Sequence, residues 1–114
     1  MKLVADANVL LAAVLGGRAK DVLNHPAIDE LLTAEVTLAE VQEYAVILAR
    51  KRRLSLDTLL LAIAALPVTV VEQAVYSSAL PRARRLIDKR DPDDVDILAL
   101  ALHMKLPVVQ RQRF

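Results

Sequence analysis

Acidic residues stand at three separate places in the chain, each beside a run of apolar residues. Asp6 ends the run that begins at Leu3, and Glu40 lies within Leu38–Val41. The segment Arg90–Leu98 holds the rest of the group, namely Asp91, Asp93, Asp94 and Asp96. Carboxylates beside apolar elements are costly to desolvate and repel one another unless a cation neutralises them. Because hard divalent metals choose oxygen ligands, this layout predicts a Mg²⁺ or Mn²⁺ site.

Each of these acids also has a structural explanation. Asp6 follows a predicted strand and could cap a helix. Glu40 could be a surface residue of an amphipathic helix, and Asp94 falls in a first helical turn, where the helix dipole favours anions. Taken one at a time, these structural roles are the favoured interpretation. Their shared placement at the ends of elements favours a common site.

Composition excludes several classes of protein. At 114 residues the chain makes one domain, residues 1–114. Cysteine is absent, which excludes disulfides and thiolate chemistry. The two histidines, His25 and His103, lie too far apart to form a zinc motif. Aromatic residues are few, which argues against a platform for stacking single-stranded nucleic acid.

Charge is balanced overall, with a net value of +1, but basic residues gather locally. Three runs are basic: Arg50–Arg53, Arg82–Arg90 and Arg111–Arg113. Such runs are usually solvated faces, and they would hold a phosphate backbone only if they flank the acidic residues. The chain has no signal-peptide pattern and no apolar run long enough to span a bilayer, so we expect a soluble, cytoplasmic protein without a membrane partner.

Predicted strands alternate with predicted helices. Strands are expected at Leu3–Ala5, Leu31–Thr33, Val68–Val71 and Val108–Val109. Helices are expected at Val9–Leu15 with Asn8 as its cap, Asp21–Asn24, Thr33–Arg53, Leu56–Leu66 capped by Ser55, Ala74–Asp88 with a break at Pro81, and Asp91 to about Lys105. This alternation predicts an α/β fold with a parallel sheet. In such sheets ligands lie beyond the carboxyl ends of the strands, which is where Asp6 stands.

Two of the predicted helices carry apolar patterns. In Thr33–Arg53 the apolar residues recur at helical steps and predict one buried face: Val36, Ala39, Val41, Tyr44, Ile47 and Leu48. Leu56–Leu66 is apolar on nearly all sides. In a chain this small, another subunit would bury part of the apolar surface of this helix, so we expect a homodimer or a partner protein.

Three segments, in this order, resemble motifs of the PIN-domain ribonucleases. Val4–Leu11 (VADANVLL) looks like their opening DxNVLL segment. Leu38–Val41 is similar to their LxEV helix, and Asp91–Ala101 (DPDDVDILALA) resembles their DPDDxxxLALA segment. Each motif alone is weakly specific, but the order and the separations also fit, and the similarity covers nearly the whole chain.

The resemblance implies a three-layer α/β/α sandwich with a central parallel sheet and a pocket for Mg²⁺ or Mn²⁺. Carried over by position, Asp6, Glu40 and Asp94 match the catalytic acids, with Asp6 and Asp94 as metal ligands. The accessory positions are Asn8, which would orient the site, Asp91 and Asp96. The implied reaction is metal-assisted hydrolysis of an RNA phosphodiester. Many members are VapC-like toxins, so the resemblance also implies an antitoxin partner.

The chain departs from the family pattern after Val109. Gln110–Arg113 stands where the family usually carries a further acid before a last short strand. We therefore consider a second hypothesis, in which the chain is a catalytically weakened module that acts through dimerisation or partner binding. A third reading, a nucleotide-binding domain without hydrolysis, is disfavoured because the sequence has no glycine-rich phosphate loop.

Overall fold

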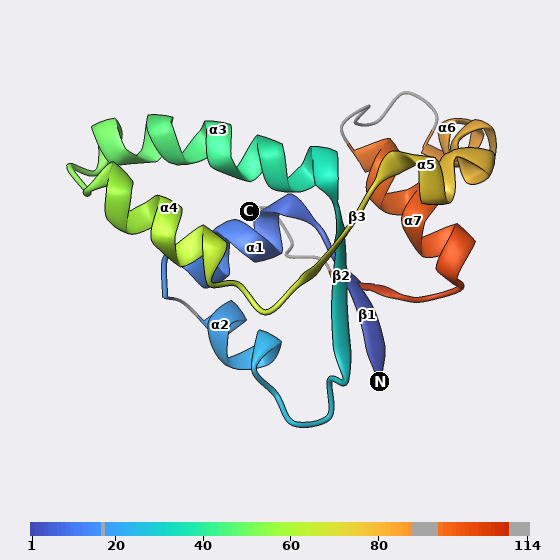
Figure 1. Cartoon of the computed structure of the whole chain (residues 1–114), viewed down its shortest axis with the longest axis horizontal. Coiled ribbons are helices and arrows are strands. Elements are labelled where there is room, and N and C mark those ends of the chain that lie inside the picture. The colour runs from blue at the N-terminus through green and yellow to red at the C-terminus, as the bar shows by residue number, and fades with distance from the viewer. Residues whose placement is uncertain (17, 88–93, 110–114) are drawn as a thin grey trace.

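The computed structural model describes residues 1–16, 18–87 and 94–109. Its strands are β1 (Lys2–Ala5), β2 (Glu30–Ala34), β3 (Thr69–Val71) and β4 (Val108–Val109). Its helices are α1 (Ala7–Val14), α2 (Arg18–Leu23), α3 (Glu35–Lys51), α4 (Leu56–Ala64), α5 (Gln73–Tyr76), the 3₁₀ turn η1 (Ser77–Ala79), α6 (Leu80–Ile87) and α7 (Val95–Met104). Within these residues the strands form one parallel sheet in the order β3-β2-β1-β4 (Figure 1). The predicted α/β fold with a parallel sheet is therefore confirmed.

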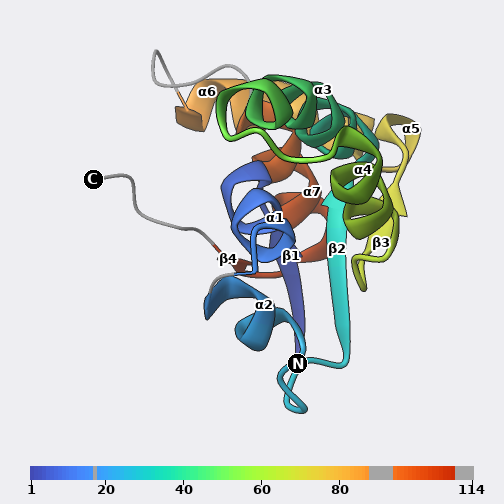
Figure 2. The same cartoon turned by 90° about the vertical axis from the view of Figure 1, so that its left-hand side faces the viewer.

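Neighbouring residues of the central strands face opposite layers of the molecule. Leu3 and Ala5 of β1 pack with α1 to α4, whereas Val4 packs with α5 to α7. In β2, Leu31 and Leu32 divide in the same way. Figure 2 looks onto α1 to α4, with α7 behind the sheet. Two apolar cores on either side of one sheet make the three-layer sandwich that was predicted.

Helix α1 begins two residues earlier than expected, at Ala7 instead of Val9, because Asp6 caps it and Asn8 does not. Asp6 has extended backbone angles, φ −85° and ψ 173°, and its Oδ1 accepts a 2.9 Å hydrogen bond from the amide of Val9. An extended residue at the end of a strand is already in the conformation that an N-cap needs. Asn8 then falls inside the first turn of the helix, where its side chain is half-buried.

The next boundaries follow local chemistry. Thr33 belongs to β2 and not to the helix, since β2 continues to Ala34 and α3 starts at Glu35. The cap predicted at Ser55 is confirmed, with its Oγ 3.3 Å from the amide of Thr58. The break predicted at Pro81 is also present, because α5, η1 and α6 replace one continuous helix.

The buried face predicted for α3 is partly wrong. Val41 and Leu48 are buried as expected, together with Thr37 and Ala45. The remaining predicted members stay exposed, namely Val36, Ala39, Tyr44 and Ile47. The buried residues of α3 recur at steps of three or four, so they form one narrow stripe along the helix. The outer side of α3 therefore keeps large apolar side chains in contact with solvent.

The C-terminal part agrees with expectation where it is described. Helix α7 ends at Met104, and Lys105 follows in the left-handed conformation with φ 57°. The strand predicted at Val108–Val109 forms β4 beside β1. The helix start predicted at Asp91 lies outside the described residues. In the part that is described, no helix combines the length and the hydropathy needed to cross a bilayer.

Candidate active site

The carboxyl end of β1 lies where the chain changes sides of the sheet. From β1 the chain passes through α1 and α2, in one helix layer, to β2 on one side of β1. Strand β4 lies on the other side of β1, and the chain reaches it through α7 in the opposite helix layer. Such a switch point leaves a crevice beyond the strand ends, and α/β proteins bind ligands there. Asp6 is the first residue after β1, so the strand order places it at this crevice.

Asp6 is held rigidly in a buried position. Its side chain is 8% exposed, and the bond from Val9 aligns it with the positive end of α1. Beside it, the buried hydroxyl of Thr33 donates a 3.0 Å hydrogen bond to the carbonyl of Ala5. This bond ties the last residue of β1 to β2. Asp6 is therefore fixed both by its own cap and by the strand that precedes it.

Glu40 lies within α3 and is half-buried, next to the fully buried Val41. One turn earlier in the same helix is Thr37, which is 1% exposed. Its Oγ1 has no hydrogen-bond partner among the described residues. An unpaired buried hydroxyl costs stability, and such groups gather near functional sites. The first turns of α3 thus present one carboxylate and one unpaired hydroxyl close to the end of β2.

Asp94 directly precedes α7 and is exposed. Its side chain makes no capping bond to the helix, so it does not play the structural role that its position suggests. Helix α7 packs against β1, β2 and α3. The three predicted acids therefore come from three elements, β1, α3 and α7, that converge around the same sheet.

Asp96, in the first turn of α7, is held by two side chains of α5. Its Oδ2 accepts a 2.5 Å hydrogen bond from the hydroxyl of Tyr76 and a 2.9 Å bond from Nε2 of Gln73. Tyr76 is fully buried. Burial, the bond to Asp96 and the nearby charge of Glu35 raise the pKa of Tyr76 above its usual range. The sequence analysis did not identify Tyr76 or Gln73, since neither belongs to a motif.

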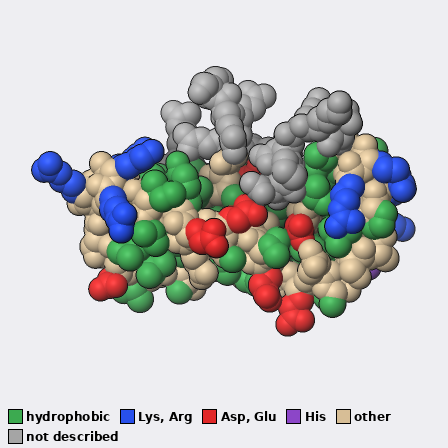
Figure 3. Space-filling model, turned by 90° about the horizontal axis from the view of Figure 1, so that it is seen from above, with side chains coloured by type: hydrophobic (Ala, Val, Ile, Leu, Met, Phe, Trp, Pro, Cys, Tyr) green, Lys and Arg blue, Asp and Glu red, His purple; other side chains and the backbone are tan. Residues whose placement is uncertain are grey.

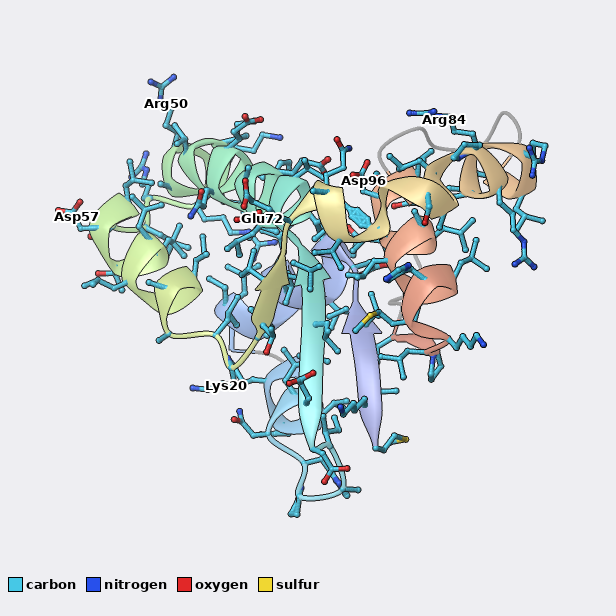
Figure 4. All side chains as sticks on the ribbon, turned by 45° about the vertical axis from the view of Figure 1, so that its right-hand side comes forward. Lys20, Arg50, Asp57, Glu72, Arg84 and Asp96 are labelled. Atoms are coloured by element: carbon cyan, nitrogen blue, oxygen red, sulfur yellow. The ribbon has the colours of Figure 1, made fainter. Side chains whose placement is uncertain are left out.

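Acidic side chains occupy the middle of the face seen from above in Figure 3, and Lys and Arg lie at its two ends. Figure 4 places Asp96 and Glu72 in the middle, with Arg50 on the α3 side and Arg84 on α6. Arg50 and Arg84, one from each of two basic runs, therefore lie on either side of the labelled acids Asp96 and Glu72. Asp91 and Asp93 lie outside the described residues.

The donors available to a metal ion are carboxylate oxygens. Among the described residues, no three His, Asp or Glu side chains are grouped closely enough to hold a metal between them. Mg²⁺, however, is usually held by one or two carboxylates together with water and substrate phosphates. The carboxylate oxygens of the predicted site residues therefore suit the chemistry of Mg²⁺ or Mn²⁺, which choose oxygen donors.

A separate pocket of about 240 Å³ lies between α1, α2 and α4. Apolar side chains such as Val14, Leu23 and Leu66 line most of it, with Lys20 and Asn24 as polar members. None of the predicted site residues lines it. It is therefore distinct from the acidic region.

Comparison with known proteins agrees with this fold. A family model described as PIN domain matches residues 4–108. The structure of VapBC2 from Rickettsia felis bound to a DNA fragment from their promoter is similar, with a TM-score of 0.74 and 13% identity over 98% of this chain and 89% of that one. VapC20 of Mycobacterium tuberculosis, a toxin that cleaves the sarcin–ricin loop, has a TM-score of 0.59 and 16% identity over 91% of this chain and 84% of that one. Curated protein sequences provide no match. The strand order, the acid at the switch point and the family match over residues 4–108 together show that the chain belongs to the PIN domain family.

Proposed function

We propose that the chain is a metal-dependent endoribonuclease and the toxin component of a toxin–antitoxin pair. The observation that carries the proposal is the placement of Asp6, buried at the switch point of the sheet and fixed by its bond from Val9. Membership of the PIN domain family and the likeness to the fold of VapC20, a toxin that cleaves the sarcin–ricin loop, support it.

Asp6 and Asp94 would hold the Mg²⁺ or Mn²⁺ ion, and Glu40 would complete the catalytic acids. When bound, such an ion supplies an activated water and offsets charge on the phosphoryl oxygens. Asp6 contributes a carboxylate whose position is set before the substrate arrives, which lowers the cost of reorganisation. Asn8, two residues further on, would orient the site, and Asp91 would be an accessory acid.

The charge pattern suits an RNA substrate. A polyanion is repelled by an acidic centre unless cations draw its backbone in from the sides. Figure 3 shows Lys and Arg at both ends of the face, and Figure 4 places Arg50 and Arg84 on either side of Asp96 and Glu72. We therefore propose that these basic residues hold the phosphates that flank the cleaved bond. An RNA substrate and an antitoxin partner also imply that the protein acts in the cytoplasm.

A homodimer is the second part of the proposal. Large apolar side chains are exposed on the outer sides of α3 and α4, including Tyr44 at 44%, Ile47 at 46% and Leu61 at 71%. Figure 3 shows hydrophobic side chains over the α3 and α4 side of the acidic face. Exposed apolar side chains that lie together mark contact surfaces in small proteins. A second copy that covers this surface would bury them.

A weakened, non-catalytic binding module is the competing function. The observation that favours it is the sequence Gln110–Arg113, which lacks the further acid of the family pattern. In that case the same apolar surface would serve dimerisation or partner binding, and RNA would not be cleaved.

One experiment separates the two functions. Purified protein is incubated with labelled single-stranded RNA and either Mn²⁺, Mg²⁺ or EDTA, beside Asp6→Asn as the inactive control. The ribonuclease proposal expects cleavage that needs the metal and that Asp6→Asn abolishes. Cleavage that persists in both EDTA and the variant comes from a contaminant, and no cleavage by a folded wild type supports the binding module.

A further inference from the structure

Asp96 lies two residues after Asp94, in the first turn of α7, yet its carboxylate is directed to α5. Tyr76 and Gln73 both lie in α5 and both donate to the same atom, Oδ2 of Asp96, at 2.5 and 2.9 Å. A carboxylate that accepts two donors on one oxygen is strongly oriented. The three side chains form a bridge between α5 and the start of α7, which we call the Asp96 bridge.

The Asp96 bridge is anchored in the core. Tyr76 is 0% exposed and packs in the same apolar core as Val95 and Ile97, the two neighbours of Asp96. Its ring cannot move without disturbing that core. Gln73, by contrast, is exposed. The bridge therefore joins a rigid buried ring to the first turn of α7, and Gln73 adds a second bond from the surface.

From this geometry we infer that Asp96 is a positioning residue, which acts through Tyr76 and Gln73 to hold Asp94 in place for metal binding. The inference rests on the proposed function. It reassigns Asp96, which the sequence analysis treated as an accessory acid of the site. Asp94 stands directly before α7 and two residues before Asp96, so the turn that the bridge holds is the one from which Asp94 extends.

The test uses Tyr76→Phe, which removes the hydroxyl and keeps the buried ring. Mn²⁺ binding is measured by calorimetry, and kcat and KM are measured with a labelled RNA. Loss of a residue that orients a ligand typically weakens metal affinity or activity by roughly 10- to 100-fold. We expect Tyr76→Phe to weaken Mn²⁺ affinity about tenfold and to lower kcat, while KM for RNA stays unchanged. Tyr44→Phe is the matched control, since Tyr44 is exposed on α3, and it should change none of these.

Gln73→Ala is a second test variant, which removes one donor to Asp96 without changing a buried side chain. It should lower Mn²⁺ affinity and kcat less than Tyr76→Phe does. A double-mutant cycle then separates positioning from direct contact with the metal. If Asp96 acts through Tyr76, the Asp96→Asn and Tyr76→Phe double variant should lose little more than Asp96→Asn alone. If Asp96 contacts the metal or the RNA itself, the two losses should add. Asp57→Asn, an exposed acid in the first turn of α4, is the control for charge removal.

The outcomes distinguish this inference from the proposed function. If the wild type cleaves RNA and binds Mn²⁺ while Tyr76→Phe and Gln73→Ala match it, the inference is wrong and the ribonuclease remains. If these variants have a lower melting temperature but unchanged Mn²⁺ affinity and kcat, the bridge contributes to stability alone and the inference is wrong. If the losses in the double-mutant cycle are additive, Asp96 contacts the metal or the RNA directly and the inference is also wrong. If the wild type neither binds Mn²⁺ nor cleaves RNA, the proposed function fails, and the inference fails with it.

Discussion

The hydroxyl of Thr33 donates a 3.0 Å hydrogen bond to the carbonyl of Ala5, across the interface between β2 and β1 and directly before Asp6. Thr33 is fully buried, so neither water nor another strand replaces this bond. The residue before Asp6, the proposed catalytic acid, is therefore held by a neutral side chain of a neighbouring strand.

Thr33→Val should lower the free energy of unfolding, because it keeps the shape of the side chain and leaves the carbonyl of Ala5 without this donor. The expected loss is about 1–2 kcal/mol, measured by urea denaturation. Thr69→Val is the control, since Thr69 is exposed in β3, and it should change stability by less than about 0.5 kcal/mol. Equal losses in the two variants would contradict a special role for the Thr33 bond.

Substitutions of Asp6 should separate the contribution of its helix cap to stability from the contribution of its negative charge to activity. Asp6→Ala removes the acceptor for Val9 and should cost about 1 kcal/mol of stability, whereas Asn is a good cap and Asp6→Asn should cost much less. Both variants should lose metal-dependent RNA cleavage. Ser55→Ala removes the cap of α4 and should lower stability without lowering activity. An active Asp6→Asn variant would remove Asp6 from the catalytic group.

Mn²⁺ should stabilise the wild-type protein against heat. A ligand that binds only the folded state at 100 times its dissociation constant adds about 2.7 kcal/mol. We expect the melting temperature to rise by several degrees in differential scanning fluorimetry with millimolar Mn²⁺. Asp94→Asn should blunt this response, and in the absence of metal it should raise the melting temperature slightly, because one like charge is removed. If Mn²⁺ does not change the melting temperature of the wild type, the binding-module function is favoured.

Alkaline pH should destabilise the protein partly through Tyr76. The pKa of Tyr76 is raised, first by burial and then by its bond to Asp96, so the folded state keeps this proton after the unfolded state has lost it near pH 10. The folded state then binds more protons, and stability falls as pH rises above that point, by up to about 1.4 kcal/mol per pH unit. The stability conferred by Tyr76 is complete below pH 10.

The measurement compares urea denaturation from pH 8 to pH 11 for the wild type, Tyr76→Phe and Tyr44→Phe. Tyr76→Phe should show a shallower decline above pH 10, whereas Tyr44→Phe should follow the wild type. Parallel curves for all three proteins would show that Tyr76 does not carry the effect.

The dimer should dissociate when its apolar surface is charged. Leu61 is 71% exposed on α4, so Leu61→Lys should leave the fold intact while making association unfavourable. Size-exclusion chromatography with light scattering at micromolar concentration should give a dimer for the wild type and a monomer for the variant. Leu15→Lys, at the far end of α1, is a control that should remain dimeric. A monomeric wild type would end the dimer proposal.

The sequence by itself determined the class of fold and the place of Asp6 at the end of a strand. Short apolar runs that alternate with helical patterns require a parallel sheet with a helix layer on each face, and the cap at Ser55 and the break at Pro81 depend only on neighbouring residues. Asp6 could be placed at a carboxyl end from the residues around it. These features are local, so periodicity and residue type suffice to predict them.

Only the tertiary structure decided which partners the predicted site residue Asp96 has. Asp96 looked like one more acid in an acidic segment, but α5, about twenty residues earlier in the chain, supplies its donors Tyr76 and Gln73. Likewise, the helical pattern of α3 could not distinguish buried Ala45 from exposed Tyr44, because the neighbouring helices and the sheet choose which stripe is covered. The local sequence pattern predicts the position of a residue within its helix or strand. Its hydrogen-bond and packing partners lie in elements that are distant in the sequence, so the spacing of residues does not predict them.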